Sequence, residues 1–165
     1  MVIAANIDET PQPKELPRDY CIRVASAKGK AVASSYPNDI VISADSTVAV
    51  GRRILGKPED TEQAKAFYRL MSGRRHKIIT AVCIINCGKI ITKVVTTIVQ
   101  FHMLGRSDID LLINSNEWQD KCGGYSIGGA GAAVIKQIIG SHANVMGLPV
   151  DMVYRVLKGM LPKPS

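Results

Sequence analysis

The sequence predicts an α/β fold with a mixed β-sheet, and three observations support that fold class. Apolar runs typical of strands alternate along the chain with segments of helical periodicity. Two long β-rich runs, 77–86 and 89–101, meet at Cys87-Gly88, which predicts an antiparallel hairpin. The chain has 165 residues, of which 46% are hydrophobic, so residues 1–165 fit a single domain with a substantial core.

The first third of the chain is expected to hold one helix and two short strand pieces. Three prolines exclude a regular element over 10–17, because they fix the backbone and remove hydrogen-bond donors. Small apolar residues at helical spacing predict a helix over 18–35. The apolar run 40–44 predicts a strand covered on both faces, 47–50 a second strand piece, and 51–58 a turn.

One further helix is expected before the hairpin in the sequence, and the remaining elements after it. Asp60 followed by Gln63 is typical of a helix N-terminus, and this helix is expected to end at Ser72-Gly73. After the hairpin, a helix is expected over 107–114 and a glycine-rich loop over 121–132. A strand over 133–139, a turn over 147–149 and a C-terminal helix over 150–158 complete the expected order.

The charge of the chain indicates an anionic ligand without saying which one. Twenty-one Lys and Arg against 14 Asp and Glu give a formal charge of +7. The basic residues are scattered and only 5% of residues are aromatic, so nucleic acid is not the expected partner. A basic nucleic-acid-binding module stays as an alternative that rests on net charge alone.

The cysteines and the apolar runs indicate a cytoplasmic protein. The four cysteines form no CxxC pair and no histidine stands at zinc-ligand spacing, so reduced thiols are expected. The first ten residues lack the basic start of a signal peptide, and no apolar run approaches the length of a membrane span. We therefore expect no membrane partner.

Three charged residues stand where a site could form, each with a structural alternative. Asp45 follows an apolar strand, where a carboxylate can bind a divalent metal or take a proton from water; a turn or cap aspartate is an equal alternative. Lys57 lies between Gly and Pro and could point at phosphate, or be an exposed turn lysine. Lys28 follows small residues on the inner helix face and could face a cleft, or extend past them to solvent.

Two further segments have weaker functional patterns. Asp8 and Glu9 could supplement Asp45 at a metal, or be solvated loop acids. The run 120–131 is dense in glycine, which permits close approach of the backbone to a ligand, but it matches no dinucleotide or P-loop motif and a flexible loop is the alternative. The three histidines are far apart in sequence and are expected to be surface or strand residues rather than bases.

Taken in order, these segments resemble the Maf (septum-formation inhibitor) family of nucleotide pyrophosphatases along essentially the whole chain. Each match is weak alone, and their order and spacing make the resemblance specific. The matching stretches are Ile7–Thr10, Tyr20–Lys30, Ser43–Asp45, Ile54–Pro58, Leu70–Gly73 with His76, Asp120–Tyr125 and Gly147–Pro149.

The resemblance implies an inosine-triphosphatase-like fold with an elongated mixed sheet and a cleft between two lobes. It implies hydrolysis of a nucleoside triphosphate to the monophosphate and pyrophosphate, with Mg²⁺ or Mn²⁺ as cofactor. Asp45 matches the proton-accepting aspartate, and Glu9 matches a carboxylate that binds the metal together with Asp45. Lys28 and Lys57 match phosphate-facing lysines. The resemblance also implies a homodimer.

The substrate-binding positions carried over from the family are less regular. Arg23 matches a family position, with a helix-surface salt bridge as its default role. Ser46 stands where dTTP/UTP-type members carry Thr, and Gly128 stands where they carry a Gln. The base therefore stays open among dTTP, UTP and modified nucleotides.

The sequence also departs from the family at its start. It contains neither the family's opening strand nor its Ser-x-Ser-Pro-Arg-Arg loop, which grips the triphosphate, and Met1-Val-Ile aligns to the strand before Asp8. We therefore expect a truncated form with weak turnover. The alternative function is a catalytically impaired, nucleotide-binding or regulatory protein.

Overall fold

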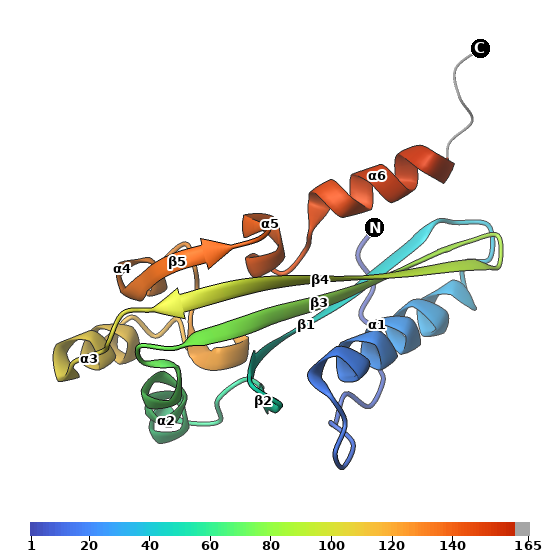
Figure 1. Cartoon of the computed structure of the whole chain (residues 1–165). Coiled ribbons are helices and arrows are strands. Elements are labelled where there is room, and N and C mark those ends of the chain that lie inside the picture. The colour runs from blue at the N-terminus through green and yellow to red at the C-terminus, as the bar shows by residue number, and fades with distance from the viewer. Residues whose placement is uncertain (161–165) are drawn as a thin grey trace.

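A long β-hairpin forms the centre of the molecule (Figure 1). The computed structural model describes residues 1–160, and in it β3 (Arg75–Asn86) and β4 (Lys89–Phe101) pair antiparallel along their whole length. The two strands are joined by the two-residue turn Cys87-Gly88. The predicted hairpin is therefore confirmed.

Three more strands extend the hairpin into a five-stranded sheet with the order β2-β1-β3-β4-β5. They are β1 (Val41–Val50), β2 (Arg53–Leu55) and β5 (Ile135–Ile139). The expected α/β class with an elongated sheet is confirmed (Figure 1). Within residues 1–160 all four pairings are antiparallel, so the structure does not contain the parallel pair that a mixed sheet would include.

The strand β1 differs from its prediction in a way that matters for the site. Two pieces were expected, 40–44 and 47–50, because Asp45 and Ser46 interrupt the apolar run. The strand is continuous, since Asp45 pairs opposite Ala81 and Ser46 opposite Thr80 in the middle of the sheet. The segment predicted as a turn over 51–58 also contains β2, which pairs with the end of β1.

Two helices cover opposite faces of the hairpin. Helix α1 (Pro17–Ala33) packs Cys21 and Ala25 on odd-numbered residues of β3, such as Ala81 and Cys83. Helix α6 (Val150–Met160) packs on even-numbered residues of the same strand, Val82 and Ile84. Because successive side chains of a strand point to opposite faces, β3 is buried on both sides.

The other end of the sheet is closed by shorter elements (Figure 1). Helices α2 (Thr61–Met71) and α3 (Arg106–Asn114) contribute to a core around Tyr68 and Phe101, next to the 3-10 turn η1 (Cys122–Gly124). Helices α4 (Gly131–Val134) and α5 (His142–Val145) were not expected, because four residues are too short to show a period. Residues 1–10 are in neither helix nor strand. Among the helices of residues 1–160, none combines the length and apolar character needed to cross a bilayer.

Candidate active site

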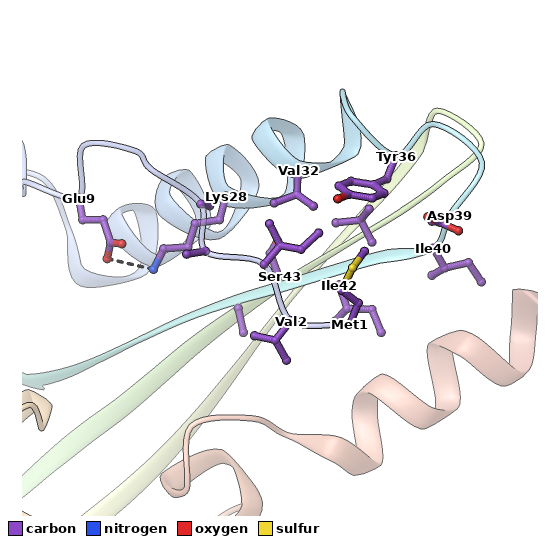
Figure 2. A pocket seen from close by; sticks show the side chains of 15 residues that line it. Met1, Val2, Glu9, Lys28, Val32, Tyr36, Asp39, Ile40, Ile42 and Ser43 are labelled. Atoms are coloured by element: carbon purple, nitrogen blue, oxygen red, sulfur yellow. Dashed lines mark ion pairs between the residues drawn. The ribbon is translucent and has the colours of Figure 1, made fainter.

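A lysine held between two carboxylates is the most distinctive polar cluster of the molecule. The Lys28 Nζ atom lies 3.0 Å from Asp45 Oδ1 and 2.9 Å from Glu9 Oε2. Lys28 comes from α1, Asp45 from the middle of β1, and Glu9 from the irregular N-terminal segment. Figure 2 shows Glu9 and Lys28 pointing toward one another. Three separate segments thus meet at one ammonium group.

Close packing of α1 on β1 creates this contact. Gly29 has no side chain, and a Cβ atom there would lie 2.7 Å from Ser43 Oγ. That hydroxyl donates a 2.7 Å hydrogen bond to the Ala25 carbonyl of α1. The helix can therefore approach the strand closely enough for the preceding residue, Lys28, to reach Asp45.

The electrostatics of the cluster favour a basic carboxylate. Burial raises the pKa of the Asp45 carboxyl, the Lys28 ammonium opposes this rise, and the Glu9 carboxylate adds to it. Asp45 Oδ2 is buried and has no hydrogen-bond partner within residues 1–160. The Asp45 carboxylate can therefore accept a proton or bind a cation through its second oxygen.

Lys28 stays charged in the same cluster. Burial acts to lower the pKa of the Lys28 ammonium, but its hydrogen bonds to Glu9 and Asp45 together raise that pKa above its ordinary value. Half-buried cations of this kind attract phosphate oxygens strongly, because little water screens them.

A large hollow of about 860 Å³ lies beside the Glu9–Lys28 end of the cluster (Figure 2). Its walls come from the N-terminal segment, from α1 and the turn after it, and from the first half of β1. The residues that line it are Met1–Ala5, Glu9, Lys28, Val32, Tyr36 and Asp39–Ala44.

A second, smaller hollow of about 210 Å³ begins at Ser46, the residue after Asp45. Its walls come from the second half of β1, from the glycine-rich loop after α3, and from the end of α5. The residues that line it are Ser46–Val48, Ile78, Asp120–Cys122, Tyr125–Ile127 and Val145–Gly147. Ala44 lines the large hollow and Ser46 the small one, whereas Asp45, between them in the sequence, is not among the lining residues of either hollow within residues 1–160.

Lys57 lies at the rim of the small hollow rather than in contact with Asp45. Its side chain is 61% exposed, and its Nζ atom lies 3.6 Å from Asp120 Oδ1. Burial raises the pKa of the Cys122 thiol; the Asp45 carboxylate adds to the rise and the Lys57 ammonium opposes it. The loop contacts the segments of both residues, because the Gly123 amide donates to the Gly56 carbonyl at 2.9 Å and the Cys122 thiol donates to the Ser46 carbonyl at 3.5 Å.

Of the three residues predicted to bind the substrate, Ser46 lines the small hollow and the other two do not, in the part of the chain that the structure describes. Ser46 lines the small hollow, and its hydroxyl contacts Thr80 Oγ1 at 2.7 Å and the Gly147 carbonyl at 3.2 Å. Arg23 binds Glu15, with Nε 2.7 Å from Oε1, which is the salt-bridge role given above as its default. Gly128 is exposed, and within residues 1–160 it lines neither hollow. The substrate roles of these three residues stay predictions.

The predicted metal ligands, Glu9 and Asp45, fit an ion such as Mg²⁺ that takes only one or two of its ligands from the protein. Glu9 and Asp45 converge on one cation, Lys28, and Asp45 has a buried oxygen without a partner. Residues 1–160 contain no group of three or more His, Cys, Asp or Glu side chains placed to bind a metal. Mg²⁺ is commonly bound by one or two carboxylates, with water and substrate phosphates completing the shell, so two carboxylates match this pattern.

Sequence reasoning singled out the loop 120–131 but missed the contact between Tyr125 and His76. Tyr125 lines that hollow, and its hydroxyl lies 2.6 Å from Nε2 of His76, which is 1% exposed. A signal was present, because in the run Arg75-His-Lys-Ile78 the histidine shares the inward-facing parity of Ile78. Nothing in the sequence indicated its partner, which is 49 residues away.

Comparison with known proteins decides the family. A protein-family model described as Maf, Maf-like protein, matches residues 1–160. The chain belongs to the Maf family. The lysine and carboxylate cluster described above therefore lies in a Maf-family fold, on the stretches through which the sequence resembled that family.

Individual Maf-family relatives share between two-fifths and half of their aligned residues with this chain. A dTTP/UTP pyrophosphatase of Roseobacter denitrificans is 48% identical over 145 residues, covering 88% of this chain and 77% of the relative. A dTTP/UTP pyrophosphatase of Sphingopyxis alaskensis is 45% identical over 150 residues, covering 90% and 78%. A nucleoside triphosphate pyrophosphatase of Anaplasma phagocytophilum is 42% identical over 159 residues, covering 96% and 82%.

Proposed function

We propose that this chain is a nucleoside triphosphate pyrophosphatase, a hydrolase that releases a nucleoside monophosphate and pyrophosphate. The names of its relatives support this activity. The structural observation that carries the proposal is the position of Lys28, 3.0 Å from Asp45 and 2.9 Å from Glu9, in the wall of the large hollow. That arrangement combines a proton acceptor, a phosphate-binding cation and a pair of metal ligands.

Asp45 acts as the general base in this proposal. Its carboxylate takes a proton from water as the water oxygen forms a bond to the α-phosphorus. The bond from the α-phosphorus to the bridging oxygen breaks, and pyrophosphate leaves with those electrons. The raised pKa of the Asp45 carboxyl supports this role, because a base of higher proton affinity accepts the proton more readily.

The cations stabilise the charge that develops on the leaving pyrophosphate. Lys28 is fixed by two carboxylates, whereas Lys57 is mostly exposed on its turn and can reach out to phosphate. Glu9 and Asp45 are the residues that would hold Mg²⁺ or Mn²⁺, which neutralises phosphate charge when bound. Lys28 is then free to exchange a carboxylate partner for a phosphate oxygen.

The small hollow receives the nucleoside part of the substrate. It adjoins Asp45 through Ser46, has a mixed polar and apolar lining, and its volume of about 210 Å³ suits a single base with part of its sugar. In this proposal Ser46, which lines the hollow, contacts the base. The names of the Roseobacter and Sphingopyxis relatives favour dTTP and UTP as the first substrates to test.

A pyrophosphate-release assay tests the proposal. The purified chain is incubated with dTTP, UTP and purine triphosphates, with Mg²⁺, with Mn²⁺ or with chelator. We expect metal-dependent release that Asp45→Asn lowers by about 10² or more, the usual contribution of a general base. Nucleotide binding without turnover, equal in both proteins, would show that the chain is a nucleotide-binding protein and not a hydrolase.

Two further assignments belong to the same proposal. A cytoplasmic location is supported by the four cysteines, none of which is in a disulfide within the described part of the chain. A homodimer is proposed from the family resemblance and is tested by light scattering.

A further inference from the structure

The wall of the small hollow rests on a buried aromatic contact that no part of the reaction uses. The ring of Tyr125 lies in edge-to-face contact with Phe101, with 4.9 Å between ring centroids, and with His76, with 5.6 Å between centroids. Its hydroxyl lies 2.6 Å from His76 Nε2. Tyr125 is 7% exposed and His76 is 1% exposed, so this contact is removed from solvent.

His76 has little else to orient it. Within residues 1–160, its other ring nitrogen, Nδ1, is buried without a hydrogen-bond partner. Burial lowers the pKa of His76 to about 4, so the imidazole is neutral near pH 7 and does not act as a general acid there. The Tyr125 hydroxyl is the single polar contact of this side chain in the described structure. Satisfying a buried imidazole in this way fixes the tyrosine as well as the histidine.

The segment that precedes Tyr125 is fixed by two hydrogen bonds and by close packing on the sheet. The Tyr68 hydroxyl of α2 donates to the Gly124 carbonyl, and the Gly123 amide donates to the Gly56 carbonyl at 2.9 Å. Gly123 has a φ of +72°, and a Cβ atom there would lie 2.9 Å from Val48 of β1. The loop therefore lies tightly against the sheet, and Tyr125 is the point at which it turns into the hollow.

We infer that His76 is a positioning residue, which sets the wall of the small hollow through its contact with Tyr125 and so sets how well the nucleoside part of the substrate binds. Ser126 and Ile127 follow Tyr125 directly and line the hollow, and Asp120 and Cys122 precede it. The inference rests on the proposed function, because it assigns the nucleoside to this hollow. It adds a role for a residue that touches neither phosphate nor base.

Tyr125→Phe tests the inference most directly, because it removes the hydroxyl and keeps the ring. We expect KM for the nucleoside triphosphate to rise about fivefold, the factor that one neutral hydrogen bond sets, with kcat changed by less than about twofold. Inhibition by inorganic tripolyphosphate, which lacks a nucleoside, is expected to stay as in the wild type.

Variants of His76 separate the contact from the ring. His76→Leu removes the polar partner and is expected to raise KM as much as Tyr125→Phe, with no further rise in the double variant. His76→Gln keeps a polar atom near the position of Nε2 and is expected to recover most of the loss. Val153→Ala is the control, because it weakens the packing of α6 on Val82 and Ile84, away from the hollow.

The outcomes distinguish positioning from stability. If Tyr125→Phe and Val153→Ala both lower Tm and neither changes KM, the contact is structural only and the inference is overturned. Equal weakening of nucleotide and tripolyphosphate binding also overturns it, because the effect then lies at the phosphates. A wild-type chain that neither hydrolyses nor binds any nucleotide defeats the proposed function itself, which is a separate result.

Discussion

At the scale of residues, the charges around Asp45 are arranged so that each neighbour moves its proton affinity in a known direction. Burial raises the pKa of the Asp45 carboxyl, Lys28 opposes the rise and Glu9 adds to it. The base must be ionised to act, so activity is expected to fall at low pH. The pH at which activity falls depends on the pKa of Asp45, and therefore on Lys28 and Glu9.

The acidic limb of the pH profile should move in opposite directions in two variants. Glu9→Gln removes a negative neighbour, so the pKa of Asp45 falls and the limb of kcat/KM moves to lower pH. Lys28→Met removes the compensating cation, so the limb moves to higher pH. Both variants are expected to be slower than the wild type, but the limb is still measurable. Limbs that coincide with the wild type would show that another group limits activity in acid.

His76 makes the stability of the fold depend on pH. The histidine has an ordinary pKa of about 6.5 in the unfolded chain, and burial lowers it to about 4 in the folded chain. Between these values the unfolded state binds a proton that the folded state does not, so stability falls as pH is lowered from 6.5 toward 4. The loss is expected to be about 3 kcal/mol, at 1.36 kcal/mol per pH unit.

Urea unfolding at several pH values measures this loss. His76→Leu lacks the titrating group, so its free energy of unfolding is expected to fall less steeply over the same range. Parallel curves for the two proteins would contradict the assignment of this pH dependence to His76.

At the scale of elements, the sequence predicted the features that depend on neighbouring residues. It missed the features that depend on contacts between distant segments. The hairpin 77–101 was predictable, because β-rich runs and a short turn are local features. The continuity of β1 was not, since Asp45 and Ser46 look like a break until β3 pairs with them. The contact of Lys28 with Asp45 joins a helix to a strand; the family resemblance implied that both belong to the site, but not that they touch.

The packing of α1 on β1 can be tested at Gly29. Alanine usually stabilises a helix relative to glycine, by roughly 0.5–1 kcal/mol. At Gly29 the added Cβ would lie 2.7 Å from the hydrogen-bonded Ser43 hydroxyl, so the helix must shift. We expect Gly29→Ala to destabilise the fold by about 1–3 kcal/mol and to lower kcat/KM, because the shift displaces Lys28.

Gly159→Ala is the matched control for this substitution. It is also in a helix, and a Cβ there meets nothing within 4 Å. Thermal unfolding and pyrophosphate release of both variants are compared with the wild type. A Gly29→Ala protein as stable and active as Gly159→Ala would show that the close packing is not needed.

At the scale of the whole molecule, the formal charge of +7 should accelerate the capture of a polyanionic substrate. Salt screens such attraction, so kcat/KM is expected to fall about three- to tenfold between about 0.05 M and 0.5 M NaCl, with kcat nearly constant. Lys57→Glu and Lys89→Glu change the net charge equally, but only Lys57 lies at the rim of the small hollow. The Lys57 variant should lose more; equal losses would mean that only total charge matters.

The whole molecule also shows how far pattern reasoning extends. The fold class followed from the order of periodic segments, but the run 40–44 was wrongly expected to be covered on both faces, because Ile40 and Ile42 are exposed. The two hollows did not follow, because each is lined by segments that are far apart in the sequence. Residues of the loop 120–127 were visible as a glycine-rich stretch and through the family resemblance of Asp120–Tyr125, but their shape comes from the sheet against which they pack.

The hairpin tip gives the molecule a natural attachment point. Cys87 is exposed at the turn, whereas Cys21 and Cys83 are buried and Cys122 is half-buried with a raised pKa. The tip lies six residues beyond Ala81, the partner of Asp45, or about 20 Å along the strand. A maleimide dye or a surface tether should therefore couple there first, so single molecules could be immobilised or labelled at a distance from Asp45.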